Sequence, residues 1–252
     1  MCHHLSLAQN IAYPEKRFGA DFEAPTSYEP SYHKAAFSSP GHSVITGDES
    51  GRIRLFRWGP GPRRVKDDGQ AEHVRRGTYN ARSEPVFDIP SLGSSILDRR
   101  CLVLADGFFE WHHSGGKKYP YHIRLGSREA FSFAGIWDTR ETGGGQMNTF
   151  SVLTTGANPL MARMHNTKKR MPVILPREDE RRWLEKGHNA GDIRAMLRPC
   201  DGDLLEAYTV SRLMSSAEGE NLPEVQAPFR YREPEPGRRD LFGPYPPDGH
   251  RN

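Results

Sequence analysis

Short apolar runs separated by polar turns are spread along most of the chain, and they predict more strands than helices. RIRLFRW alternates charged and apolar residues, the period-two pattern of a strand with one buried face. Gly-rich segments at 114–118 and 142–148 are expected to join neighbouring strands as hairpins. The predicted strands are 42–46, 52–58, 101–111, 119–125, 131–137, 149–155 and 171–175.

Three short helices are predicted in the second half of the chain. Residues 157–166 offer Asn158 as an N-cap and Pro159 at the first helical position. Residues 176–187 place acidic side chains in the first turn and a glycine at the end, and 190–199 end at a proline. We therefore expect an α+β fold, a β-rich single domain over residues 1–228 with a few flanking helices. Residues 229–252 are proline-rich, and we expect this tail to be disordered.

Composition narrows the class of protein. Only 35% of the residues are hydrophobic, and 25 glycines and 20 prolines imply many loops. No apolar run approaches the roughly 20 residues of a membrane span, and the start lacks the order of a signal peptide. We therefore expect no membrane association, and a cytoplasmic, nucleoid-associated location in a bacterium or a nuclear one in a eukaryote. Three scattered cysteines give neither a disulfide framework nor a CxxC zinc pair.

The net charge of +3 is mild, but basic residues are concentrated between positions 52 and 76. Phe56 and Trp58 lie within this segment. Basic and aromatic side chains together suit a surface that follows a nucleic-acid backbone and stacks on its bases. A solvated charged loop is the alternative interpretation. The basic residues are Arg52, Arg54, Arg57, Arg63, Arg64, Lys66, Arg75 and Arg76, against Asp67, Asp68 and Glu72.

Cys2 is the first candidate for chemistry. Removal of Met1 would leave a free amine and a free thiol on one residue. The amine, with an ordinary pKa of roughly 7.7–8.0, forms a Schiff base with an aldehyde, and the thiol then closes a thiazolidine ring. An ordinary terminus is one alternative. Zinc binding through Cys2, His3 and His4 is another, but adjacent ligands rarely surround one tetrahedral ion, and we expect no metal.

Three further stretches carry candidate residues, each with a structural alternative. In TYNARSEP, Asn80, Arg82 and Glu84 alternate along an extended segment and would share one face, suited to holding a phosphate. The alternative is a polar strand edge.

In RRCLVLADGFFEWH, Glu110 ends an apolar run, and burial there would raise its pKa towards that of a general acid or base. The alternative is a carboxylate facing solvent. Cys101, in the same run, is expected to be a core residue.

His165 lies near the end of the helix predicted at 157–166, where the helix dipole favours the protonated imidazolium. Lys168, Lys169 and Arg170 follow it. A proton donor beside basic residues suits acid catalysis on an anionic polymer. A structural histidine is the alternative.

Six motifs follow the cysteine at position 2 in order along the chain: RWG, NARSE, RCLVLADGFFEW, FSFAGIWD, SVLTT and H…RMPVIL. Taken together, they resemble the SOS response associated peptidase (SRAP) family of abasic-site DNA–protein crosslink proteins. The resemblance covers roughly residues 1–230.

The resemblance implies a distorted barrel-like sheet with a positively charged DNA groove. It also implies a monomer that needs no cofactor and crosslinks to abasic sites in single-stranded DNA through a thiazolidine on its N-terminal cysteine. By motif, the catalytic residues would be Cys2, Asn80, Glu110 and His165. The DNA-binding residues would include Arg82, Arg170, His4, Trp58, Thr154, Thr155, Lys168 and Lys169.

The sequence departs from the family pattern at its start, where the family has Gly-Arg and this chain has His3 and His4. An imidazole would replace the missing phosphate contact only in part. The longer spacing before Arg170 lets Lys168 or Lys169 share its role.

Two other functions remain open: a cysteine-type peptidase, including one that removes its own Met1, and a non-catalytic module that binds modified DNA.

Overall fold

The computed structural model describes residues 2–38, 41–59, 79–142, 145–215 and 221–231. Five of its strands close into a barrel. In the order of their pairing they are β5 (Glu49–Trp58), β4 (Gly41–Thr46), β7 (Arg100–Ala105), β10 (Phe131–Thr142) and β11 (Gly145–Gly156). β11 pairs in parallel with β5 and completes the ring. The barrel-like sheet expected from the family resemblance is confirmed.

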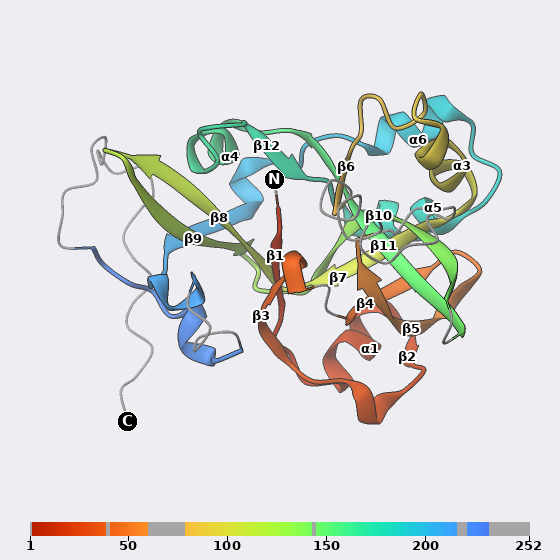
Figure 1. The fold of residues 1–252 in the computed structure, drawn as a ribbon, viewed down its shortest axis with the longest axis horizontal. Coiled ribbons are helices and arrows are strands. Elements are labelled where there is room, and N and C mark those ends of the chain that lie inside the picture. Colours follow the sequence, from red (N-terminus) through yellow and green to blue (C-terminus); the bar gives the residue numbers. More distant parts are fainter. Residues whose placement is uncertain (1, 39–40, 60–78, 143–144, 216–220, 232–252) are drawn as a thin grey trace.

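A second sheet of five strands lies beside the barrel. Its order is β14 (Leu205–Thr209), β9 (Lys117–Leu125), β8 (Gly107–Ser114), β1 (His4–Leu7) and β3 (Ser31–Ala35). In Figure 1, β1 runs through the middle of the molecule between the β8–β9 hairpin and the barrel, and α4 and β12 lie next to its start. Cys2, which precedes β1, shares one hydrophobic cluster with residues of the barrel and of the second sheet.

The remaining elements of the described residues are short. The helices are α1 (Ala12–Phe18), α3 (Pro90–Asp98), α4 (Pro159–Met164), α5 (Arg177–Leu184) and α6 (Ala190–Met196). The short strands are β2 (Asp21–Phe22), β6 (Asn80–Arg82), β12 (Arg170–Pro172) and β13 (Ile174–Leu175). Turns of 3-10 helix occupy Pro25–Ser27, Ala36–Ser38, Gly202–Leu204, Arg212–Ser215 and Pro223–Gln226. None of the helices in the described ranges is long and apolar enough to cross a membrane.

Strand β7 separates two hydrophobic cores. Cys101, Val103 and Ala105 belong to one cluster, while Leu102 and Leu104 belong to the other. This split follows from the alternation of side chains along a strand, and it requires every residue from Cys101 to Ala105 to be apolar. It confirms that Cys101 is a core residue.

The apolar run 101–111 does not form the one long strand that its sequence predicts. The chain breaks at Asp106, whose carboxylate accepts hydrogen bonds from Ser6 Oγ and Ala8 N, both at 2.6 Å. At Gly107 a Cβ would lie 2.1 Å from His122 Nε2, so only glycine fits. The first half of the run therefore closes the barrel, and the second half, with Glu110, joins the other sheet beside β1.

The predicted cap of α4 is confirmed. Asn158 Oδ1 accepts from Met161 N at 2.8 Å, and Pro159 is the first helical residue. The helix predicted at 176–187 is observed as α5, and that predicted at 190–199 as α6, each shorter at its C-terminal end. The packed chain also extends past the expected boundary at 228, since Tyr231 Oη donates to Val210 O at 2.7 Å. Most of the predicted tail, 232–252, lies outside the described residues.

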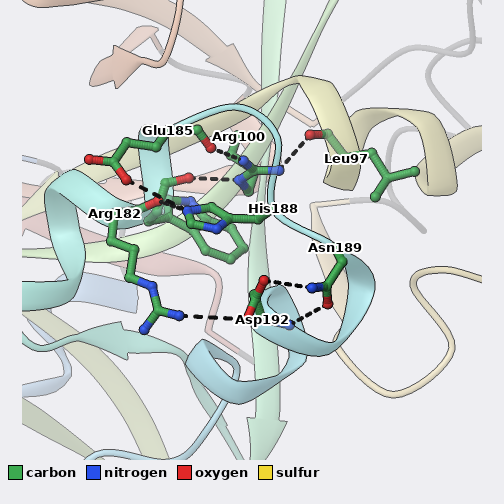
Figure 2. Close-up of polar contacts among 8 residues, drawn as sticks. Leu97, Arg100, Arg182, Glu185, His188, Asn189 and Asp192 are labelled. Carbon is green, nitrogen blue, oxygen red and sulfur yellow. Dashed lines mark hydrogen bonds and ion pairs between the residues drawn. The ribbon is translucent and has the colours of Figure 1, made fainter.

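The Arg100 side chain donates hydrogen bonds to carbonyl groups at the ends of two helices, which would otherwise lack a donor (Figure 2). It is only 3% exposed, and its guanidinium donates to Trp183 O at 2.7 Å and to Ile96 O at 2.8 Å. Leu97 O and Glu185 O accept from it as well. These carbonyls end α3 and α5, where a positive charge is also favoured by the helix dipole.

Substituting Arg100 with alanine is expected to lower the free energy of unfolding by on the order of 3 kcal/mol, because several buried carbonyls lose their donor together. Urea denaturation would measure the loss. Arg181→Ala, at an exposed position of α5, is the matched control and should change stability by no more than about 0.5 kcal/mol. Equal effects of the two substitutions would contradict this role for Arg100.

Candidate functional site

The site begins with Cys2, which lies just before β1 and is completely buried. Strand β1 pairs with β8 in the register Leu5 to Phe108 and Ser6 to Gly107. Continuing this antiparallel register towards the start of the chain brings the first residues alongside Glu110. The Cys2 thiol makes a weak hydrogen bond to His4 O at 3.8 Å. Burial, and secondarily the charge of Glu110, raises the pKa of this thiol far above its ordinary value.

Glu110 lies on β8 and is 3% exposed. Burial raises the pKa of its carboxyl from 4.5 to about 7. The direction expected from the apolar run is therefore confirmed, and the solvent-facing alternative is wrong. A carboxyl with a pKa near neutrality is able both to donate and to accept a proton under physiological conditions.

His165 follows α4, and its Nδ1 lies 3.8 Å from Glu110 Oε1. Nδ1 is also 3.1 Å from Arg170 O, and because a carbonyl only accepts, this nitrogen carries the proton of the neutral ring. Burial lowers the pKa of His165 to about 4. The expectation of a protonated imidazolium is wrong, because desolvation here outweighs the dipole of a six-residue helix.

Asn80 lies on β6, which pairs in parallel with β11 at Val152. It is 8% exposed, and neither its Oδ1 nor its Nδ2 makes a hydrogen bond to any described residue. The neighbouring Tyr79 has its ring 6.0 Å from that of His3, so this segment lies beside the start of the chain. Buried amides are normally satisfied, and one that is not is suited to hold a ligand.

His3 and His4 share Phe37 as a neighbour but otherwise contact different residues. His4 Nδ1 is 2.7 Å from His33 Nε2, and its ring packs edge-on against Trp111 at 4.5 Å. The His3 ring contacts Phe37 at 5.0 Å. Burial lowers the pKa of His3 to about 4 and that of His4 to about 3. Both rings are therefore neutral at pH 7, so His4 offers no positive charge in place of the arginine of the family pattern.

Arg170 is held inside the protein by Glu84. Its guanidinium makes two parallel hydrogen bonds to the Glu84 carboxylate, at 2.7 and 2.9 Å, and also donates to the carbonyl and hydroxyl of Thr154. The Thr154 hydroxyl contacts Ala81 O. Arg170 and Thr154 thus join β6, β11 and β12, while Thr155 is buried on β11. Glu84 is one of the candidate residues that the sequence indicates, but the sequence alone does not identify Arg170 as its ion-pair partner.

The candidate cations that remain at the surface are Arg82, Lys168 and Lys169. The charge of Arg82 acts on Glu84. The charge of Lys168 acts on His3, Glu110 and His165, which places it close to the site. Lys169 has a positive φ of 49° and donates its backbone N–H to His165 O at 2.9 Å.

Trp58 and Phe56 do not form the stacking surface expected of the basic segment. They are 0% and 1% exposed, and the Trp58 ring stacks on Phe150 inside the core at 5.7 Å. The Trp58 indole N–H donates to Tyr79 O at 3.0 Å, which fixes the residue before Asn80. The basic residues from Arg63 to Arg76 lie outside the described residues.

Cys2, Glu110 and His165 therefore form one cluster, with Asn80 next to the same chain end, although they are far apart in the sequence. In the comparison with known proteins, the sequence profile of the SOS response associated peptidase (SRAP) family matches residues 1–217. The chain belongs to this family. The prediction made from the motifs is confirmed.

Several relatives of this SRAP protein are named as abasic site processing proteins. YoqW of Bacillus subtilis is 35% identical, over 89% of this chain and 98% of its own length. HMCES of Gallus gallus is 28% identical, over 82% of this chain and 68% of its own length. A crystal structure of a protein from Bacteroides thetaiotaomicron superposes with a TM-score of 0.84 at 31% identity, covering 91% of this chain and all of that one.

Proposed function

We propose that this protein processes abasic sites in single-stranded DNA by joining its N-terminal cysteine covalently to the ring-opened sugar. The observation that carries the proposal is the burial of Cys2 at the chain end beside a carboxyl whose pKa is raised to about 7. The names of the relatives support the same class of substrate.

The reaction needs an aldehyde, which an abasic sugar supplies on ring opening. The free amine of Cys2, once Met1 is removed, adds to the aldehyde carbon and a water molecule leaves, giving an imine. The thiol sulfur then bonds to the imine carbon while its proton passes to the nitrogen, which completes the thiazolidine. The overall change is one new C–N bond, one new C–S bond and the loss of one water.

The electrostatics of the site fit this order of steps. Burial raises the pKa of the thiol, so it stays protonated while the amine attacks first. As a carboxylic acid, Glu110 donates a proton to the departing water, and as a carboxylate it accepts one from the thiol. The amide of Asn80 is able to hold the sugar hydroxyls, and the neutral His165 ring, with its proton on Nδ1, offers Nε2 as a proton acceptor. Arg82 and Lys168 would contact phosphates.

A peptidase that cleaves added substrates is the weaker candidate. Cysteine peptidases attack with a thiolate, which requires a thiol pKa lowered by a nearby positive charge. Here burial and Glu110 both raise the pKa of Cys2. We restrict peptidase activity to removal of the protein's own Met1, which the intact mass of the purified protein would test.

Crosslinking to DNA tests the main proposal. Wild-type protein and the Cys2→Ser variant are mixed with single-stranded DNA that has one abasic site, and adducts are resolved on a denaturing gel. We expect a heat-stable adduct with the wild type and none with the variant. Cys200→Ser, which removes another free thiol, should react like the wild type.

A second DNA, with a tetrahydrofuran in place of the abasic sugar, has no aldehyde and should give no adduct. An adduct that forms equally well with Cys2→Ser, or with tetrahydrofuran DNA, would overturn the thiazolidine mechanism.

A further inference from the structure

Phe37 is an exposed aromatic side chain placed directly over the first residues of the chain. It lies in the 3-10 turn Ala36–Ser38 that follows β3, the strand next to β1 (Figure 1). Its side chain is 57% exposed. Its ring centroid nevertheless lies 5.0 Å from that of His3, 5.9 Å from His4 and 5.7 Å from Tyr79.

The position of Phe37 distinguishes it from the other exposed apolar residues of the described chain. Those are Leu55, Ile89, Leu97, Leu204, Leu213, Leu222 and Phe229. All but Phe229 are aliphatic, and the Phe229 ring packs on Tyr231, whose ring contacts Tyr119 on β9. The Phe37 ring instead contacts His3 and Tyr79, which flank Cys2 and Asn80.

The rings beneath Phe37 are uncharged, which favours a flat ligand over an anion. Burial lowers the pKa of His3 to about 4, so its ring is a neutral aromatic at pH 7. The Tyr79 ring meets Phe37 edge-on, at 84°, and so supports it from the side. Together they hold the Phe37 ring in place while leaving more than half of the side chain open to solvent.

We propose that Phe37 is the stacking surface for the nucleobase next to the abasic nucleotide. This inference rests on the function proposed above. An abasic nucleotide leaves the base beside it without a stacking partner on one side, and an aromatic side chain replaces that partner for any base because every base has a π-face. Arg82 and Lys168 are exposed cations of the same region and suit the adjoining phosphates.

The experiment uses an unreactive lesion, so that binding is measured apart from chemistry. Single-stranded DNA with one tetrahydrofuran and a 2-aminopurine beside it is titrated with the full-length protein. Stacking of 2-aminopurine on an aromatic ring quenches its fluorescence. We expect quenching by the wild type and by Phe37→Trp. Both Phe37→Ala and Phe37→Leu should lose the quenching and bind on the order of ten-fold more weakly.

The variants separate aromatic stacking from a general apolar contact. Phe37→Leu keeps an apolar side chain, so its failure to quench assigns the effect to the aromatic ring. Phe229→Ala removes a comparably exposed aromatic residue away from the site and should leave affinity and quenching unchanged. Unaltered quenching and affinity in Phe37→Ala would overturn the proposal, as would an equal loss in Phe229→Ala.

The same variants distinguish this inference from the proposed function. With a true abasic site at saturating DNA, Phe37→Ala should form the Cys2-dependent adduct at the wild-type maximal rate but need about ten-fold more DNA for half of it. Normal adduct formation without any change in binding would refute the stacking role alone. Absence of an adduct in the wild type would refute the covalent function, whatever Phe37 does.

Discussion

Glu110→Gln is expected to slow adduct formation at pH 7 by roughly 100-fold or more, the usual contribution of a positioned general acid or base. Glutamine keeps the shape and polarity of the side chain but neither donates nor accepts the proton that the imine and thiol steps require. Binding to DNA with a tetrahydrofuran should stay unchanged, because the carboxyl is buried and the substitution leaves the exposed cations Arg82 and Lys168 in place. Single-turnover kinetics on an abasic oligonucleotide would measure the rate.

The pH dependence provides an internal check on this role. In the wild type, the acid form of Glu110 declines above its pKa of about 7, while the free amine increases up to roughly 7.7–8.0. The rate should therefore pass through a maximum near neutrality. In Glu110→Gln the descending limb should vanish, so that the slow residual rate only rises with pH. A descending limb that persists in the variant would assign it to another group.

Stability should change in the opposite direction to activity. The folded protein holds the Glu110 proton up to about pH 7, whereas an unfolded glutamate releases it near 4.5. Ionisation therefore favours the unfolded chain as pH rises from 4.5 to 7, and the full penalty applies above 7. Glu110→Gln should stabilise the protein by on the order of 3 kcal/mol at pH 8, and far less at pH 5. Urea denaturation at both values would measure the difference.

Local signals in the sequence predict local features of this protein well. The Asn158–Pro159 pair marks the start of α4, and the apolar run before Glu110 indicates that its carboxyl is buried. In both cases the cause lies within a few residues of the effect. RIRLFRW also forms the predicted strand, as part of β5, but it does not bury one face, since Leu55 is exposed and Ile53 and Phe56 lie in different clusters.

Features that depend on distant parts of the chain could not be predicted in this way. The break at Asp106 is caused by Ser6 and Ala8, about a hundred residues earlier. The burial of Trp58 depends on its stacking with Phe150, and the low pKa of His165 on the packing around α4. Strand β1, which positions Cys2 in the site, has only four residues, and no long apolar run in the sequence predicts it.

The candidate site shows the same division between local and distant information. Motifs identify Cys2, Asn80, Glu110 and His165 as residues with chemical potential. Their assembly depends on the pairing of β1 with β8 and of β6 with β11. A register is set by partners across the sheet, so the motifs give the residue types of the site and the two sheets give its geometry.

Asn80→Leu is expected to abolish most adduct formation without destabilising the protein. Leucine has nearly the shape of asparagine, and the Asn80 amide makes no hydrogen bond to a described residue that the substitution would break. Replacing a buried, unsatisfied polar group with an apolar one should leave stability unchanged or raise it by about 1 kcal/mol. The loss of a positioned donor should reduce the rate of adduct formation by roughly 100-fold or more.

Asn189 offers the opposite control. Its side chain caps α6 by accepting from Asp192 N at 3.0 Å and donating to Asp192 Oδ2 at 2.8 Å (Figure 2). Asn189→Ala should lower the free energy of unfolding by about 1 kcal/mol and leave adduct formation intact. If Asn80→Leu instead destabilised the protein and reacted at the wild-type rate, Asn80 would be a structural residue. A stable but unreactive Asn80→Leu would mean that the protein carries an unsatisfied amide in its interior because the reaction uses it.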